Sequence, residues 1–185
     1  APCTEGEEQF CEGPHGQTMT YNGYWKPDPG FNTFGGYSSN IVAQEKFVMR
    51  IPENLDIKAA APILCAGITT YSPLKRFGVK AGHKVGIIGI GGLGHMGIKI
   101  AKAMGASVTA ITSSEEKRSA ALELGADQVI VSTNQQEMEG ACAKYDFLLA
   151  TIPYAFELND YTPLLRRRGA LVTVGLLGPY KSPTN

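Results

Sequence analysis

From Asp56 onward, short apolar stretches alternate with longer segments in which apolar residues recur every three or four positions. The apolar stretches predict short buried β-strands at Val85–Ile88, Val108–Ile111, Val129–Val131, Phe147–Ala150 and Leu171–Val174. Continuous Val, Ile and Leu are typical of a parallel sheet that is covered on both faces, since neither face then needs polar side chains. The alternation of strands and helices predicts an α/β fold built on a parallel sheet.

Helices are predicted in the intervening segments. The first carries apolar residues from Leu93 to Met104 at helical spacing and ends at Gly105. Others are expected at Glu115–Leu124, at Gln135–Lys144 and at Glu157–Arg168, although Pro163 disfavours the first half of the last one. The run Arg166-Arg167-Arg168 would then end the last helix, where cations complement the helix dipole, so this run is interpreted as structural and not as an anion site.

The chain before Asp56 has a different texture. It is rich in turn signals such as Pro27-Asp28-Pro29-Gly30 and Gly35-Gly36, which predict loops and a few strands. The change in texture divides the chain into two expected domains, residues 1–56 and residues 57–185.

A glycine motif joins the first strand of the α/β region to its first helix. Gly89-Ile90-Gly91-Gly92-Leu93-Gly94 fits G-x-G-x-x-G in the strand–turn–helix context that a dinucleotide requires. Gly89 permits the tight turn, Gly91 lets the backbone approach a pyrophosphate, and Gly94 lets helix and strand pack closely. The alternative is an ordinary glycine-rich turn without a ligand.

The end of the second strand predicts which dinucleotide binds. Thr112, Ser113 and Ser114 stand where an NAD site places a carboxylate, and Lys117 and Arg118 follow. Hydroxyl groups and a cation can hold a 2′-phosphate that a carboxylate would repel, so NADP(H) is favoured. The missing carboxylate also argues against S-adenosylmethionine. In the alternative interpretation, Ser113 or Ser114 only caps the next helix and both cations are solvated.

Composition excludes several classes of protein. Lys+Arg 17 balance Asp+Glu 17, which argues against nucleic-acid binding through phosphate contacts. The chain has neither a long apolar run nor a secretory signal, so a cytoplasmic protein outside the membrane is expected. A disulfide framework is therefore not expected of the 4 cysteines. From composition alone, Cys3 and Cys11 are two thiols, Cys65 is a buried small hydrophobe, and Cys142 has no role.

Four blocks of sequence resemble one family: Gly35-Gly36-Tyr37-Ser38, Arg50-Ile51-Pro52, the run from Ala60 to Leu74 (AAPILCAGITTYSPL), and the run from Gly89 to Lys99 (GIGGLGHMGIK). They are similar to zinc-dependent medium-chain alcohol dehydrogenases, in particular the cinnamyl alcohol dehydrogenase-like branch. This resemblance implies a Rossmann doubly wound parallel sheet, with five of six strands expected. It also implies that a partial GroES-like catalytic domain with half of a structural zinc lobe precedes the sheet.

The resemblance also assigns roles to residues. Cys65 would be a ligand of the catalytic zinc, and Cys3 and Cys11 would be ligands of the structural zinc. Cofactor contacts would come from the 2′-phosphate site at Thr112, Ser113, Ser114 and Lys117, the turn at Gly89, Gly91, Gly92, Leu93 and Gly94, Thr69 beside the nicotinamide, and Thr151, Ile152, Val174, Gly175 and Leu176 along its ribose and carboxamide. No role is assigned to His95, which is expected to be half-exposed on a helix.

The resemblance implies hydride transfer between NADP(H) and a primary alcohol or aldehyde in a parent enzyme that is a homodimer. Family members are roughly twice as long, consistent with a two-domain count, so the other zinc ligands and the sixth strand are expected outside Ala1–Asn185. This stretch alone is therefore expected to keep the cofactor site without holding zinc tightly or catalysing the reaction. One alternative is an inactive NADP-binding module. The other is a zinc-independent quinone or enone reductase, and Cys65 argues against this second alternative because a protein without zinc does not need a cysteine there.

Overall fold

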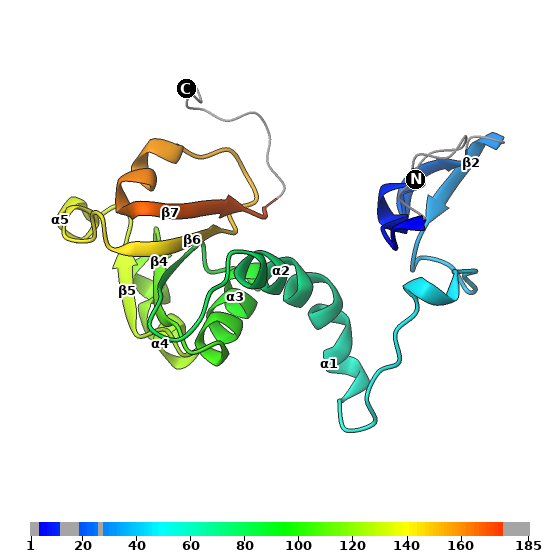
Figure 1. The fold of residues 1–185 in the computed structure, drawn as a ribbon, viewed down its shortest axis with the longest axis horizontal. Helices are drawn as coiled ribbons and strands as arrows, with labels where there is room; N and C mark the ends of the chain where they lie inside the picture. Colours follow the sequence, from blue (N-terminus) through cyan, green and yellow to red (C-terminus); the bar gives the residue numbers. More distant parts are fainter. Residues whose placement is uncertain (1–3, 12–18, 26–27, 176–185) are drawn as a thin grey trace. The chain divides into compact units, whose positions relative to one another are not determined.

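A computed structural model describes residues 4–11, 19–25 and 28–175 of the chain (Figure 1). The chain forms two compact units that meet in sequence between Arg50 and Ile51. Within the described ranges, no helix is long and apolar enough to cross a membrane.

The first unit is built from turns and one small sheet. Strands β1 (Tyr21–Trp25) and β2 (Asp28–Phe34) pair antiparallel, and short 3₁₀ turns form at η2 (Glu8–Phe10) and η3 (Glu45–Phe47). The Tyr21 ring packs edge to face against Tyr37, and its hydroxyl accepts a hydrogen bond from the backbone N–H of Gly36 at 3.3 Å. The prediction of loops with a few strands is confirmed.

The second unit contains a five-stranded parallel sheet in the order β5-β4-β3-β6-β7. Its strands are β3 (Lys84–Ile88), β4 (Ser107–Thr112), β5 (Gln128–Val131), β6 (Tyr145–Ala150) and β7 (Leu165–Thr173), so each predicted strand is present. The chain runs outward from β3 through β4 to β5, then returns to place β6 on the other side of β3. This reversal makes the fold doubly wound, and ligands of such sheets bind at the carboxyl ends beside the reversal.

Helices and turns cover both faces of the sheet, as the continuous apolar strands predicted. Segments α1 (Ile57–Pro62), η4 (Ile63–Gly67, a π-helical turn) and α2 (Ile68–Arg76) precede β3. On one face, Ile87 of the sheet packs with Leu74 of α2, Ile98 of α3 (Gly92–Ala103) and Ala121 of α4 (Arg118–Glu123). Neighbouring side chains of a strand point to opposite faces, so Ile88 joins the second core cluster, with Met138 of α5 (Gln135–Glu139) packed against it.

Two predicted helices are shorter than expected. The segment Glu115–Leu124 forms a 3₁₀ turn, η5 (Glu115–Lys117), that continues into α4. The helix expected at Gln135–Lys144 ends with α5 at Glu139, just before Gly140, because glycine is a poor helix former.

The predicted helix at Glu157–Arg168 is wrong. The segment forms two 3₁₀ turns, η6 (Leu158–Asp160) and η7 (Thr162–Leu164), and β7 begins directly at Leu165. Pro163 lacks the N–H that a helix interior requires, and the edge of β6 provides hydrogen-bond partners for an extended chain.

The helix-dipole role predicted for the three arginines is therefore also wrong. They belong to a bulge in β7, because Tyr145 pairs with Leu165 whereas Phe147 pairs with Ala170. Arg168 has a φ of 67°, and the Arg166 guanidinium pairs with the carboxylate of Asp146. The arginines complement no helix dipole.

Candidate functional site

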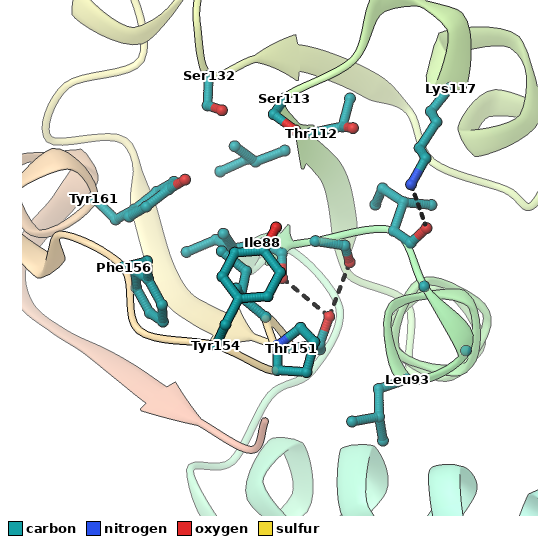
Figure 2. A pocket seen from close by; sticks show the side chains of 17 residues that line it. Ile88, Leu93, Thr112, Ser113, Lys117, Ser132, Thr151, Tyr154, Phe156 and Tyr161 are labelled. Carbon is teal, nitrogen blue, oxygen red and sulfur yellow. Dashed lines mark hydrogen bonds between the residues drawn. The ribbon is translucent and has the colours of Figure 1, made fainter. Parts of the chain in front are cut away.

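A pocket of about 530 Å³ lies at the carboxyl ends of β3, β4, β5 and β6 (Figure 2). It is therefore at the reversal of strand order, where a doubly wound sheet binds its ligands. Its lining comes from five stretches of chain: Ile88–Leu93, Ile111–Ser113 with Lys117, Ser132, Thr151–Tyr154, and Phe156 with Tyr161.

The glycines of the motif differ in their surroundings. Gly89 makes the turn with a φ of 89°, and its N–H donates to the Ile111 carbonyl at 2.9 Å. A Cβ atom on Gly94 would lie 2.0 Å from the Gly89 carbonyl oxygen, so only glycine lets α3 start this close to the turn. A Cβ atom on Gly91 or Gly92, in contrast, would have no other atom within 4 Å. Their backbone is open to a ligand at the N-terminus of α3.

Thr151 holds the glycine turn from the neighbouring strand. Its hydroxyl lies 3.0 Å from the carbonyl oxygen of Ile88 and 2.9 Å from that of Gly89, and it is the donor to both (Figure 2). Its backbone N–H also donates to Ile88, at 2.8 Å. These bonds fix the turn relative to β6.

The residues after β4 are arranged around one end of the pocket. Thr112 is buried, and its Oγ1 accepts the backbone N–H of Ser114 at 3.3 Å. Ser113 and Lys117 are exposed and line the pocket, and the Lys117 ammonium donates to the Ile90 carbonyl at 3.5 Å. Ser114 does not line the pocket, and its side chain does not cap η5, so the alternative in which Ser114 is a cap is wrong.

Arg118 does not share the surroundings of Lys117. Its guanidinium binds the carboxylates of Glu115 and Glu137 and donates to the Val129 carbonyl at 2.8 Å. Glu115, with a smaller contribution from Glu137, raises the pKa of Arg118 further above its ordinary value. The ion pair with Arg118 lowers the pKa of Glu115. Arg118 is thus occupied by a salt-bridge network, and Lys117 is the cation that lines the pocket in the described part of the chain.

Other residues expected to bind cofactor lie outside this pocket. Thr69 is half-buried on α2. Val174 follows β7, where its N–H donates to the Ala150 carbonyl at 2.9 Å. A Cβ on Gly175 would lie 1.9 Å from the Ile152 carbonyl oxygen, which places Gly175 directly against a pocket residue. Leu176 lies outside the described residues. His95, to which no role was assigned, is exposed on α3.

The cysteines do not form a metal site within the part of the chain that the structure describes. Cys65 is exposed on η4, so the interpretation of Cys65 as a buried hydrophobe is wrong. Cys11 is half-buried just after η2, and Cys3 lies outside the described residues. No group of three or more His, Cys, Asp or Glu residues that could hold a metal ion occurs among described residues. A set of zinc ligands is therefore not present there, and the zinc assignments stay predictions.

Sequence reasoning missed one wall of the pocket: Ser132, Pro153, Tyr154, Phe156 and Tyr161. Ser132 follows β5 as Thr112 ends β4, so its place at a carboxyl end was detectable. Tyr161 lies in the segment that was predicted to be helical, and Tyr154 and Phe156 lie in the loop between β6 and that segment. Burial raises the pKa of Tyr161, whose hydroxyl shares a hydrogen bond with Ser132.

Comparison with known proteins supports a family assignment. Residues 92–184 match the sequence profile of the zinc-binding dehydrogenases. The chain belongs to this family. It is 50% identical over 183 residues to aldehyde reductase YahK of Escherichia coli (strain K12), a match that covers 98% of this chain and 51% of YahK.

Two solved structures share the fold of this chain. A cinnamyl alcohol dehydrogenase from Sorghum bicolor superposes with a TM-score of 0.89 at 39% identity, covering 98% of this chain and 52% of that protein. The enzyme CAD from Helicobacter pylori, solved with NADP(H), gives 0.82 at 40% identity, covering 95% of this chain and 48% of that one. The resemblance to the cinnamyl alcohol dehydrogenase branch and the Rossmann α/β fold are confirmed. The chain spans about half the length of these relatives.

Proposed function

We propose that this zinc-binding dehydrogenase chain binds NADP(H) and is the cofactor-binding part of an alcohol dehydrogenase or aldehyde reductase. The observation that carries the proposal is one pocket that joins an open glycine turn to Ser113 and Lys117 and has no acidic residue in its described lining. The complex of the Helicobacter pylori enzyme with NADP(H) supports the same cofactor for this chain.

Each part of the pocket has a chemical task in this proposal. The open backbone at Gly91 and Gly92 and the first N–H groups of α3 would hold the pyrophosphate, because unpaired N–H groups and the helix dipole favour an anion. Ser113 and Lys117 would hold the 2′-phosphate by charge-assisted hydrogen bonds. Thr112 is buried, lines the same pocket, and keeps the segment in place through its bond to Ser114. The bound cofactor would supply or accept the hydride.

The remaining assignments rest on the family. A primary alcohol or aldehyde is proposed as substrate, as the name of YahK suggests. Cys65 is proposed as a ligand of the catalytic zinc, which its exposure permits, and Cys3 and Cys11 as ligands of a structural zinc. A homodimeric, cytoplasmic parent enzyme and a division of the chain into residues 1–56 and residues 57–185 belong to the same proposal.

A titration of the 185-residue chain with NADPH and separately with NADH, followed by the fluorescence of the reduced nicotinamide, tests the proposal. We expect tighter binding of NADPH. Lys117→Gln should weaken NADPH binding by about tenfold and leave NADH binding unchanged, since a charge-assisted bond contributes on the order of 1.5–3 kcal/mol. Lys99→Gln, which changes an exposed lysine on α3, is the matched control and should have no effect. Equal affinity for the two cofactors would contradict the proposal.

Thr112→Asp tests the selectivity of the same segment in the opposite direction. A carboxylate at the end of β4 would repel the 2′-phosphate and offer an acceptor to a free ribose hydroxyl, so preference should move toward NADH. An unchanged ratio of the NADPH and NADH affinities would show that this segment does not select the cofactor.

A further inference from the structure

Tyr154 is an exposed aromatic residue in a pocket whose other aromatic residues are buried. Its exposed fraction is 66%, against 8% for both Phe156 and Tyr161. Phe156 and Tyr161 pack edge to face, with ring centroids 5.6 Å apart, and both belong to the second core cluster of the sheet. Their rings are packed in the core. Tyr154 is therefore the aromatic side chain of the pocket that is accessible to a ligand.

The backbone holds Tyr154 at a defined place beside the glycine turn. It follows Thr151, which is buried and bonded to the carbonyls of Ile88 and Gly89, and Pro153, whose ring fixes its own φ and restricts the residue before it. In Figure 2 the Tyr154 ring points into the pocket, and Ser113 and Ser132 appear across the pocket from it in this view. A flat ligand between these walls would lie against the Tyr154 ring.

The chemistry of the dinucleotide indicates which of its two rings this is. In NADP(H), the 2′-phosphate and the adenine are attached to the same ribose, whereas the nicotinamide lies beyond the pyrophosphate. A phosphate held by Ser113 and Lys117 therefore places the adenine within one sugar of these residues. Of the residues expected along the nicotinamide end, Thr69 and Val174 do not line this pocket, whereas Thr151 and Ile152 do. Because Ser113 and Lys117 line the same pocket as Tyr154, the planar group that reaches Tyr154 should be the adenine.

We propose that Tyr154 stacks on the adenine ring of NADP(H) and so positions the adenosine end of the cofactor. The inference rests on the proposed function. Stacking of an aromatic side chain on a base requires ring area and no particular hydrogen-bonding edge. The hydroxyl of Tyr154 is accordingly dispensable for this role, and its ring is required.

Two variants and three probes test the proposal on the full 185-residue chain. The variants are Tyr154→Ala, which removes the ring, and Tyr154→Phe, which keeps it. The probes are NADPH, adenosine 2′,5′-bisphosphate and reduced nicotinamide mononucleotide, which carry both rings, the adenine alone and the nicotinamide alone. Tyr71→Ala removes an exposed tyrosine of α2 outside the pocket and is the matched control. Circular dichroism verifies that each variant folds.

We expect Tyr154→Ala to lower the affinity for NADPH and for adenosine 2′,5′-bisphosphate by on the order of tenfold. The affinity for the nicotinamide probe should not change. Tyr154→Phe should stay within about twofold of the unsubstituted chain for all three probes. If Tyr154→Ala weakens binding of the nicotinamide probe and not of the bisphosphate, the adenine assignment is wrong. If Tyr154→Ala binds all three probes as the unsubstituted chain does, the stacking role is wrong. If the unsubstituted chain binds neither NADPH nor the bisphosphate, the proposed function itself is wrong, and this inference falls with it.

Discussion

Gly94 and Gly91 belong to one motif, but substitution of each should impair the protein for a different physical reason. A methyl group on Gly94 would lie 2.0 Å from the Gly89 carbonyl oxygen and 3.3 Å from Thr151 Oγ1. A normal contact needs the start of α3 to move away from the turn by at least about 1 Å. A Cβ atom on Gly91 would have no other atom within 4 Å, so a larger side chain there meets only space that we assign to the pyrophosphate.

The magnitudes follow from these contacts. Overpacking by Gly94→Ala costs about 1–3 kcal/mol of unfolding free energy, and a lost Thr151–Gly89 hydrogen bond adds about 1 kcal/mol. The sum of about 2–4 kcal/mol should lower Tm by on the order of 10 °C. Gly91→Val should change stability by no more than about 0.5 kcal/mol, because its φ of −108° is extended backbone that valine adopts. Its NADPH affinity should fall by roughly two orders of magnitude.

Thermal unfolding by far-ultraviolet circular dichroism, together with NADPH titration, separates the two effects. Gly94→Ala should lose stability and binding together, whereas Gly91→Val should lose binding alone. A Gly94→Ala variant that melts like the unsubstituted chain would refute the packing argument. A Gly91→Val variant that binds NADPH normally would show that the turn does not face the pyrophosphate.

Three further predictions concern single residues. Arg168→Gly should raise stability by about 0.5–1 kcal/mol, because a φ of 67° strains arginine and not glycine; Arg167→Gly is the control, and an equal gain in both would count against strain. Lys102 and the Val108 N–H lower the pKa of Asp127, so its contribution to stability is present above the ordinary aspartate pKa of about 3.9 and is lost as pH falls through the lowered value. Urea unfolding of Asp127→Asn and the unsubstituted chain should differ at neutral pH, and the difference should shrink toward about pH 3; a constant difference would exclude this pair as the cause. In the full-length parent, Cys65→Ser should remove turnover and one zinc per subunit, measured by metal analysis, and normal zinc content would refute its role as a ligand.

The glycine motif shows how local sequence can define a site. A strand of Val and Ile, a turn with glycine at fixed steps and a helix with apolar residues at helical spacing are all encoded within Val85–Met104. The structure has this arrangement at β3 and α3. Such elements could be predicted because their hydrogen bonds and turn geometry depend on residues that are near in sequence.

The segment Glu157–Arg168 shows where local pattern fails. Its apolar residues fit a helix as well as a strand, and the free edge of β6, which decides for a strand, lies elsewhere in the chain. Because the segment was assigned to the wrong element, Tyr161 was not connected with the pocket.

The sequence by itself determined the parallel sheet, the turn at Gly89 and the chemical type of the residues after β4. Only the tertiary structure separated Lys117, which lines the pocket, from Arg118, which Glu137 of the next helix holds in an ion pair. The same structure left Tyr154 exposed while it buried Phe156. Both distinctions depend on partners that lie on other elements, and pairing with such partners is settled when the elements pack.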